Sequence, residues 1–151
     1  MKLKFDCLAD LLAHLDGITP DNHRTRGKWT AAQIFYHLAA AFEGSLNGLP
    51  AGYPFLTRWM ARCFRWMIIR YWFPPFIPIP SAIRDSLAPP DTCDFLTQKQ
   101  RLVHAIDAFD SHNQPHPPHP VLGKFTHEQW VGFHLRHCER HLAFIDYLLG
   151  S

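Results

Sequence analysis

Apolar residues recur at the spacing of an α-helix in five segments of this chain, and no segment shows sustained alternation of apolar and polar residues. The first segment shows the pattern most simply, with Leu8, Leu11, Leu12 and Leu15. We expect helices from residue 8 to near 17, over 31–47, over 55–73, from 91 or 92 to 112, and from 127 almost to the C-terminus. These patterns predict an all-α protein, with four long helices and a short or broken fifth, in a single domain over residues 1–151.

Two of the predicted helices carry capping signals at their N-termini. Thr30 precedes the second helix, Gln33 completes a capping box three residues later, and Trp29 stands at the position of a hydrophobic staple. Thr126 stands in the same place before the last helix, with Gln129 in its first turn. We therefore expect both helices to begin directly after these threonines.

Two proline-rich segments separate the helices. Residues 74–90, PPFIPIPSAIRDSLAPP, contain six prolines. Because proline lacks an amide donor and restricts the residue before it, we expect this segment to be irregular and packed against the helices. The second segment, residues 114–123, holds His116 and His119. These two histidines could border a cavity, but exposure in a loop is the simpler expectation.

The helix predicted over residues 55–73 combines an apolar face with four arginines. Its apolar positions are Trp59, Met60, Cys63, Phe64, Met67 and Ile68. The simplest interpretation places this face against the other helices and leaves the arginines in solvent. Two alternatives use the same residues: a helix that lies on a membrane surface, or a homodimer contact, since Trp and Arg are enriched at interfaces.

Charge and composition argue against several classes of function. The net charge of +2 is too small for a surface that binds nucleic-acid phosphates. No stretch reaches the roughly 18 uncharged apolar residues of a membrane span, and no N-terminal signal sequence is recognisable. Four isolated cysteines without a CxxC pair favour reduced thiols, so we expect a cytoplasmic protein. Motifs typical of glycosidases, kinases and serine hydrolases are not found.

Histidine is over-represented, with 11 residues beside 5 lysines. His134, His137 and His141 share the core-facing stripe of the last predicted helix with Trp130, and the stripe continues to Phe144, Ile145 and Leu148. His137 and His141 have the i, i+4 spacing at which two imidazoles can bind one ion. His37, at the inward edge of the second helix, could supply a third ligand. Three imidazoles without a carboxylate would leave a divalent ion its +2 charge and open positions for water or a thiolate.

A second interpretation of these histidines needs no metal. Neutral imidazoles can be buried in a helical core when carbonyls or water satisfy their nitrogens. His134 is expected to fill the core or to support a ligand from behind. Cys138 points about 100° away from His137 around the helix axis, which predicts a core thiol rather than a catalytic His–Cys pair.

Two segments resemble a known family. WTAAQIFYHL at residues 29–38 and HPVLGKFTHEQWVGFHLRHCERHL at residues 119–142 resemble parts of the DinB superfamily of metal-binding four-helix bundles, in particular a branch of uncharacterised bacterial proteins. The resemblance implies an up-down-down-up four-helix bundle with proline-rich connecting loops. It also implies a divalent metal ion, most often zinc or nickel, bound by His37, His137 and His141.

The resemblance carries expectations about activity as well. Some members of the superfamily are metal-dependent transferases that act on low-molecular-weight thiols, and others have no known activity. The resemblance therefore implies a thiol transferase or a hydrolase acting on a small-molecule thiol or electrophile. The sequence departs from the usual pattern at Arg140 and Phe144, so the substrate pocket and the catalytic base stay unassigned. The alternative is a non-enzymatic helical protein with structural histidines that acts by self-association or by binding a protein partner.

Overall fold

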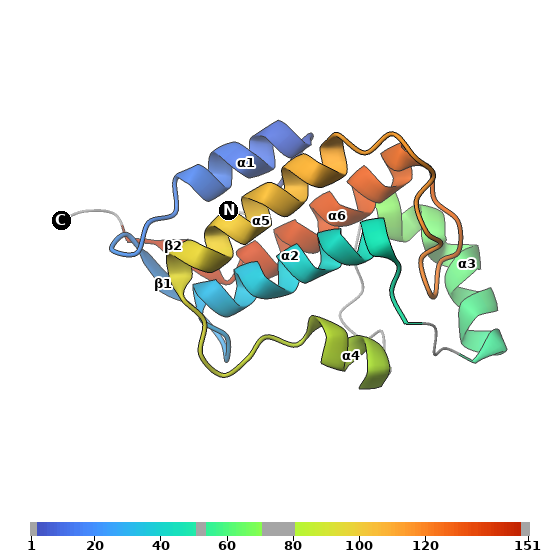
Figure 1. Ribbon diagram of the computed structural model, residues 1–151, viewed down its shortest axis with the longest axis horizontal. Coiled ribbons are helices and arrows are strands. Elements are labelled where there is room, and N and C mark those ends of the chain that lie inside the picture. Colours follow the sequence, from blue (N-terminus) through green and yellow to red (C-terminus); the bar gives the residue numbers. More distant parts are fainter. Residues whose placement is uncertain (1–2, 51–53, 71–80, 149–151) are drawn as a thin grey trace.

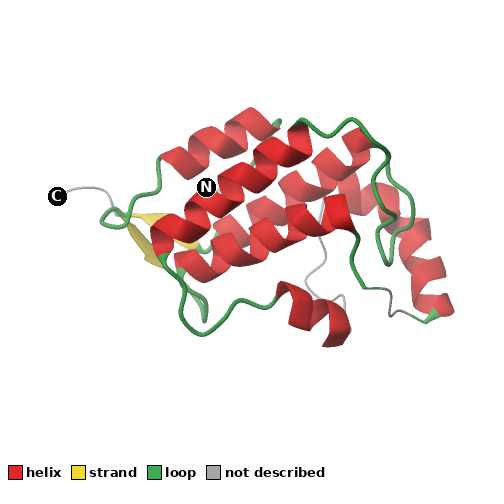
Figure 2. Cartoon of the chain, viewed as in Figure 1, coloured by secondary structure: helices red, strands yellow, loops and turns green. Residues whose placement is uncertain are grey.

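The computed structural model describes residues 3–50, 54–70 and 81–148, and these residues are predominantly helical. Six helices and one two-stranded sheet are found in the described parts of the chain (Figure 2). In chain order they are α1 (Leu8–Asp16), β1 (His23–Thr25), α2 (Ala31–Asn47), α3 (Phe55–Arg70), α4 (Ser81–Leu87), α5 (Phe95–Asp110), α6 (His127–Leu142) and β2 (Ile145–Tyr147). The prediction of a mainly helical protein is confirmed.

Four helices, α1, α2, α5 and α6, lie side by side along the longest axis of the molecule (Figure 1). The chain runs in one direction in α1 and α6 and in the opposite direction in α2 and α5 (Figure 1). α2 packs against α5 and α6, and α1 packs against the same two helices. Their buried side chains form one core, which includes Leu11, Phe35, Leu38, Phe42, Leu102, Ile106, Phe109, Trp130 and Leu142. This core holds α2 and α6 next to each other although they are distant in the sequence.

Capping boxes fix the starts of α2 and α6. Thr30 Oγ1 accepts the backbone N–H of Gln33 at 3.2 Å, and Gln33 Oε1 accepts the N–H of Thr30 at 3.0 Å. Thr126 and Gln129 make the same two bonds at 3.2 and 3.0 Å. Each box satisfies backbone donors that have no partner inside the helix. Both predicted starts are confirmed.

α5 begins at Phe95, later than the predicted start at Asp91 or Thr92. Its N-cap is Asp94, whose Oδ2 accepts the backbone N–H of Thr97 at 2.8 Å. Asp91, Thr92 and Asp94 can each cap a helix, and their side-chain chemistry alone does not show which of them does so.

Besides the helices, the structure has a small two-stranded sheet that the sequence analysis did not predict, and the expectation of a last helix that runs almost to the C-terminus is wrong. α6 ends at Leu142, and β2 then pairs with β1 in an antiparallel sheet. Arg26 accounts for this end, because its backbone N–H donates to Phe144 O at 2.8 Å and its Nη2 donates to Ala143 O at 2.8 Å. In a longer helix these two carbonyls would instead accept hydrogen bonds from N–H groups of the helix.

Because α6 ends at Leu142, the buried residues near the C-terminus differ from those predicted. Phe144 and Leu148, predicted on the core-facing stripe, are exposed. Ile145 is buried, but as a strand residue opposite Thr25. The core-facing stripe of α6 therefore ends with the helix, at Leu142.

The first proline-rich segment is only partly irregular. Residues 74–80, and the predicted helical residues 71–73, lie outside the described residues. Ser81–Leu87 form α4, a short helix that contacts α2 and buries Ile83. This stretch can be helical because all prolines of the segment lie outside it. The expectation that the segment packs against the helices is confirmed for α4.

α3 turns its predicted core face away from the rest of the molecule, which contradicts the sequence interpretation. The exposed side chains at the predicted core positions are Trp59, Met60, Cys63, Phe64 and Met67, and the side chain of Ile68 is not among those described. The partly buried positions are Thr57, Ala61, Arg65 and Ile69, four residues apart, and α3 packs against α6. Periodicity shows that a helix has two faces, but it does not show which one meets the core.

None of the described helices has both the length and the apolar composition needed to cross a membrane.

Candidate metal centre

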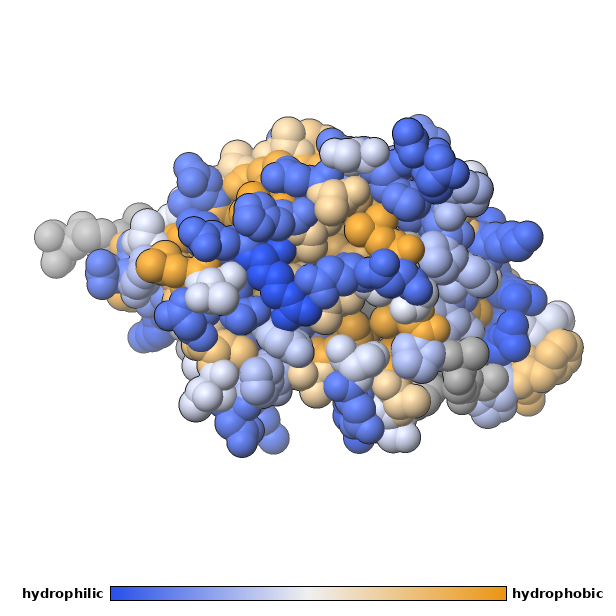
Figure 3. All heavy atoms as spheres, viewed as in Figure 1, coloured by the Kyte–Doolittle hydropathy of each residue, from blue (hydrophilic) through white to orange (hydrophobic). Residues whose placement is uncertain are grey.

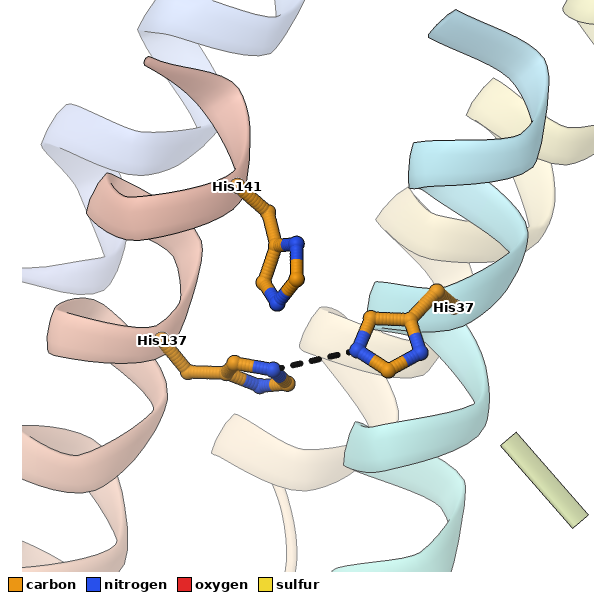
Figure 4. A group of neighbouring side chains, drawn as sticks. All are labelled: His37, His137 and His141. Carbon is orange, nitrogen blue, oxygen red and sulfur yellow. Dashed lines mark hydrogen bonds between the residues drawn. The ribbon is translucent and has the colours of Figure 1, made fainter. Parts of the chain in front are cut away.

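Three histidine side chains converge between α2 and α6 (Figure 4). His37 comes from the first half of α2, and His137 and His141 come from the last turns of α6. One ring nitrogen from each residue lies within 4.8 Å of the others. The ring centroids are 5.1 Å apart for His37 and His137, 4.6 Å for His37 and His141, and 4.7 Å for His137 and His141. The structure thus brings together the three residues predicted as ligands.

A backbone carbonyl fixes the orientation of His37. Its Nδ1 lies 3.0 Å from Leu87 O, at the end of α4. Because a carbonyl oxygen only accepts, Nδ1 carries the proton, and Nε2 presents its lone pair to the other two histidines. Metal-binding histidines are commonly held in this way by a second hydrogen bond.

His37 and His137 approach each other through their Nε2 atoms, which are 3.2 Å apart (the dashed line in Figure 4). With the His37 lone pair on Nε2, the His137 Nε2–H is the donor of this hydrogen bond. Two nitrogens bound to one tetrahedral zinc ion at about 2.0–2.1 Å would lie roughly 3.4 Å apart. If the proton of His137 moved from Nε2 to Nδ1 and the two rings moved slightly apart, both Nε2 atoms could therefore bind the same ion.

The environment keeps the three imidazoles neutral. Burial lowers the pKa of His37, and the hydrogen bond to Leu87 opposes this only in part. Burial, and repulsion by the positive charge that His141 and His37 would carry if protonated, lower the pKa of His137 well below its usual value. Burial and the charges of His37 and Arg140 lower the pKa of His141 to about 3. Neutral imidazole is the form that binds metal, so protons do not compete for these ligands at neutral pH.

The ligand set contains no carboxylate among the described residues that could join it. Three neutral ligands would leave a divalent ion its full +2 charge. A four-coordinate ion would keep one position for water, a thiolate or another anion. This chemistry belongs to open sites rather than to closed structural ones.

Trp29 forms one wall of the centre. Its ring stacks on His141, with centroids 6.0 Å apart and planes at 18°, and lies 5.1 Å from the ring of His37. His37 and His137 are buried, whereas His141 and Trp29 are partly exposed. The side of the centre that faces solvent is therefore the side of Trp29 and His141.

His134 and Cys138 lie in the core rather than among the ligands. Ser45 donates its hydroxyl proton to Phe42 O at 2.6 Å, so its Oγ accepts from His134 Nε2 at 3.0 Å. His134 is fully buried, as expected for a residue that fills the core. Cys138 is also fully buried, and burial raises the pKa of its thiol, which confirms the predicted core thiol.

The expectation that His116 and His119 are exposed is wrong, because both are partly buried. Nδ1 of His119 accepts the backbone N–H groups of Val121 and Leu122, both at 3.1 Å, and burial lowers the pKa of His119 to about 4. His116 Nε2 lies 3.0 Å from Nδ1 of His127. The proline-rich loop folds back on α6, and neither residue joins the candidate centre.

Two contributors to the centre were not assigned to it from the sequence. Trp29 was recognised only as a helix staple, and its stacking on His141, 112 positions later, has no local sequence signal. Leu87 acts through its carbonyl, which every residue type carries, so no sequence signal could have identified it.

The chain matches the model of the family described as "Protein of unknown function (DUF1569)" over residues 1–147. The matched residues include all three histidines of the candidate centre. No curated protein and no solved structure matches the chain.

Proposed function

We propose that this protein, which belongs to the DUF1569 family, binds a divalent metal ion through His37, His137 and His141. One observation carries the proposal. Ring nitrogens from two helices, 100 residues apart in sequence at His37 and His137, meet within 4.8 Å. Neutral imidazole nitrogens suit zinc or nickel better than calcium or magnesium, which prefer oxygen.

We propose further that the fold is a DinB-like, up-down-down-up four-helix bundle formed by α1, α2, α5 and α6. The chain directions in these helices, one way in α1 and α6 and the opposite way in α2 and α5 (Figure 1), support this assignment. The two segments that resemble the DinB superfamily contain all three proposed ligands. They also contain Trp29, which contacts two of them.

The activity that fits such a centre is transfer of a small-molecule thiol to an electrophile, or hydrolysis of a small molecule. A bound ion would lower the pKa of a thiol or water and supply it as a nucleophile. His37, held by Leu87, and the two histidines of α6 would hold the ion, and Trp29 would limit access of bulk water. Because the ligands bring no negative charge, the centre would favour an anionic thiolate.

Metal analysis of protein purified without an affinity tag tests the proposal. We expect near-stoichiometric zinc or nickel in the wild type, little in His37→Ala or His141→Ala, and no change in His104→Ala. His104 is an exposed histidine on α5 and controls for surface binding. Wild-type protein that binds neither ion after refolding with each would contradict the proposal.

The rival function, a non-enzymatic protein with structural histidines, also has an observation in its favour. Both ring nitrogens of His37 already have protein partners, Leu87 O and His137 Nε2. An assay for transfer of common cellular thiols to reactive electrophiles, with and without a chelator, separates the two functions. Turnover that a chelator abolishes supports the metal-dependent enzyme, whereas metal-free protein without turnover supports the rival.

A further inference from the structure

α3 carries a continuous apolar surface that the rest of the described protein leaves uncovered. We call it the α3 outer face, and it consists of Phe55, Leu56, Trp59, Met60, Phe64 and Met67. Leu56 is 65% exposed and Trp59 is 57% exposed. Figure 3 shows apolar and charged side chains together at the end of the molecule that α3 forms. Single exposed apolar residues are common on proteins, but several large ones on one helix face mark a binding surface.

Specific contacts hold α3 in this orientation. A Cβ atom on Gly132 of α6 would lie 2.9 Å from Ile69 Cγ2 and 3.2 Å from Ile69 O, so the two helices meet at very close range. Arg65 Nη1 donates to Lys124 O at 3.2 Å, and its guanidinium lies 5.8 Å from the centre of the Phe125 ring. Turning the apolar side inward would break these contacts. The outward direction of the apolar side chains is therefore built into the fold.

Positive charge is concentrated on the same helix. α3 contains four arginines and no acidic residue. The rest of the chain then has 11 Lys and Arg against 13 Asp and Glu, a net charge of −2. Arg58 and Arg62 are exposed and lie along one edge of the α3 outer face. The surface thus combines exposed aromatic and aliphatic side chains with a cationic edge.

We propose that the α3 outer face attaches the protein to the surface of an anionic lipid bilayer. The helix would lie in the plane of the interface, with Trp59 and Leu56 among the acyl chains and the arginines beside lipid phosphates. Charge favours this partner over a second copy of the chain. Two copies joined through this face would bring the exposed Arg58 and Arg62 of both chains together without an acidic residue on either α3.

Flotation with lipid vesicles tests the attachment. Full-length protein is mixed with vesicles of phosphatidylcholine and phosphatidylglycerol in equal parts, or of phosphatidylcholine alone, at low and high salt. We expect binding to the anionic vesicles, weaker binding at high salt, and little binding to the neutral vesicles. Absence of binding to the anionic vesicles, or equal binding to both kinds, would overturn the proposal.

A matched pair of leucines identifies the face. Leu56→Ser removes a leucine of the α3 outer face, and Leu96→Ser removes one on α5 that is 58% exposed. The variant Leu56→Ser/Trp59→Ser should bind anionic vesicles at least about tenfold more weakly, whereas Leu96→Ser should bind within about twofold of wild type. Arg58→Gln/Arg62→Gln should weaken binding to anionic vesicles and reduce its dependence on salt. Unchanged binding by the double variant of the face would overturn the proposal, with circular dichroism as the check that each variant is folded.

Sedimentation in the absence of lipid tests whether a second copy of the chain covers the α3 outer face. A wild-type dimer that Leu56→Ser converts to a monomer would show that another chain covers the face, and would overturn the proposal. A wild type and variant with the same oligomeric state support it. None of these outcomes depends on metal binding by the three histidines.

Discussion

α2 and α3 have 17 and 16 residues and are both rich in apolar side chains, but the fold uses them in opposite ways. Eleven residues of α2 are buried, whereas every described side chain of α3 is at least partly exposed. α2 packs against α4, α5 and α6, while α3 packs mainly against α6. An enclosed helix can hold a histidine in a dry, neutral state suited to a metal. A peripheral helix instead presents its apolar residues to the surroundings.

Two phenylalanines give the largest expected contrast between the helices. Phe42 of α2 is fully buried against Phe109 and His134, with ring centroids 5.4 and 3.9 Å away, whereas Phe64 of α3 is 55% exposed. Phe42→Ala should lower the free energy of unfolding by about 3–5 kcal/mol because it leaves a cavity. Phe64→Ala should change it by less than about 0.5 kcal/mol. Urea denaturation measures both, and equal losses would refute the contrast.

Acid should destabilise the fold through His119, in the loop before α6, but leave the charge of α3 unchanged. Burial lowers the pKa of His119 from 6.5 to about 4 in the folded protein. Between these values the unfolded chain binds more protons, so stability is full above pH 6.5 and falls as the pH decreases. The loss for this residue alone is about 1.4 kcal/mol per pH unit, or roughly 3 kcal/mol by pH 4.

Denaturation at pH 7, 6 and 5 measures this loss, and His119→Gln should make it less steep. α3 has no histidine and no acidic residue, the residue types whose ordinary pKa values lie near this range. Vesicle binding by protein that is still folded should therefore not weaken between pH 7 and 6. A free energy of unfolding that is constant from pH 7 to 5 would contradict the lowered pKa of His119 in the folded protein.

Gly132→Ala tests the contact that positions α3. Alanine is the better helix former by about 1 kcal/mol, but its Cβ would lie 2.9 Å from Ile69 Cγ2 and 3.2 Å from a backbone oxygen. We expect the clash to outweigh the gain, with a net loss of roughly 1–2 kcal/mol, and faster proteolysis within α3. A variant more stable than wild type would show that α3 is not held closely against α6.

The smallest expected difference concerns threonines near the helix starts. Thr30 accepts the N–H of Gln33 at 3.2 Å at the start of α2, and Thr30→Ala should cost about 1 kcal/mol. Thr57 lies in the first turn of α3 and is not its N-cap, so Thr57→Ala should change stability by less than about 0.5 kcal/mol. Thermal unfolding of the two variants compares them directly, and a cost at Thr57 equal to that at Thr30 would go against the expectation.

Local chemistry explains what could be predicted from the sequence. Thr30 and Thr126 mark helix starts because their side chains bond to backbone atoms three residues away. His137 and His141 could be placed on one face because four residues are about one helical turn. These inferences need only a helix, and the structure confirms each of them.

Long-range contacts explain what could not be predicted. The two three-residue strands are too short to show an alternating pattern, and only their pairing defines them. Arg26 ends α6 from a position 117 residues away from the carbonyl it contacts at Ala143. The orientation of α3 depends on Gly132, and the tautomer of His37 on the carbonyl of Leu87. Each depends on a distant partner whose position no local pattern specifies.

The separation of His37 from His137 has a consequence for synthesis on the ribosome. Because they are 100 positions apart, α2 is made long before α6 leaves the exit tunnel. At the usual 5–20 residues per second, the first histidine waits roughly 5–20 seconds for the other two. Until then the nascent chain has only one of the three proposed ligands, and a single imidazole binds divalent ions too weakly to retain one. The proposed metal would therefore be loaded only after α6 has been made and has packed against α2.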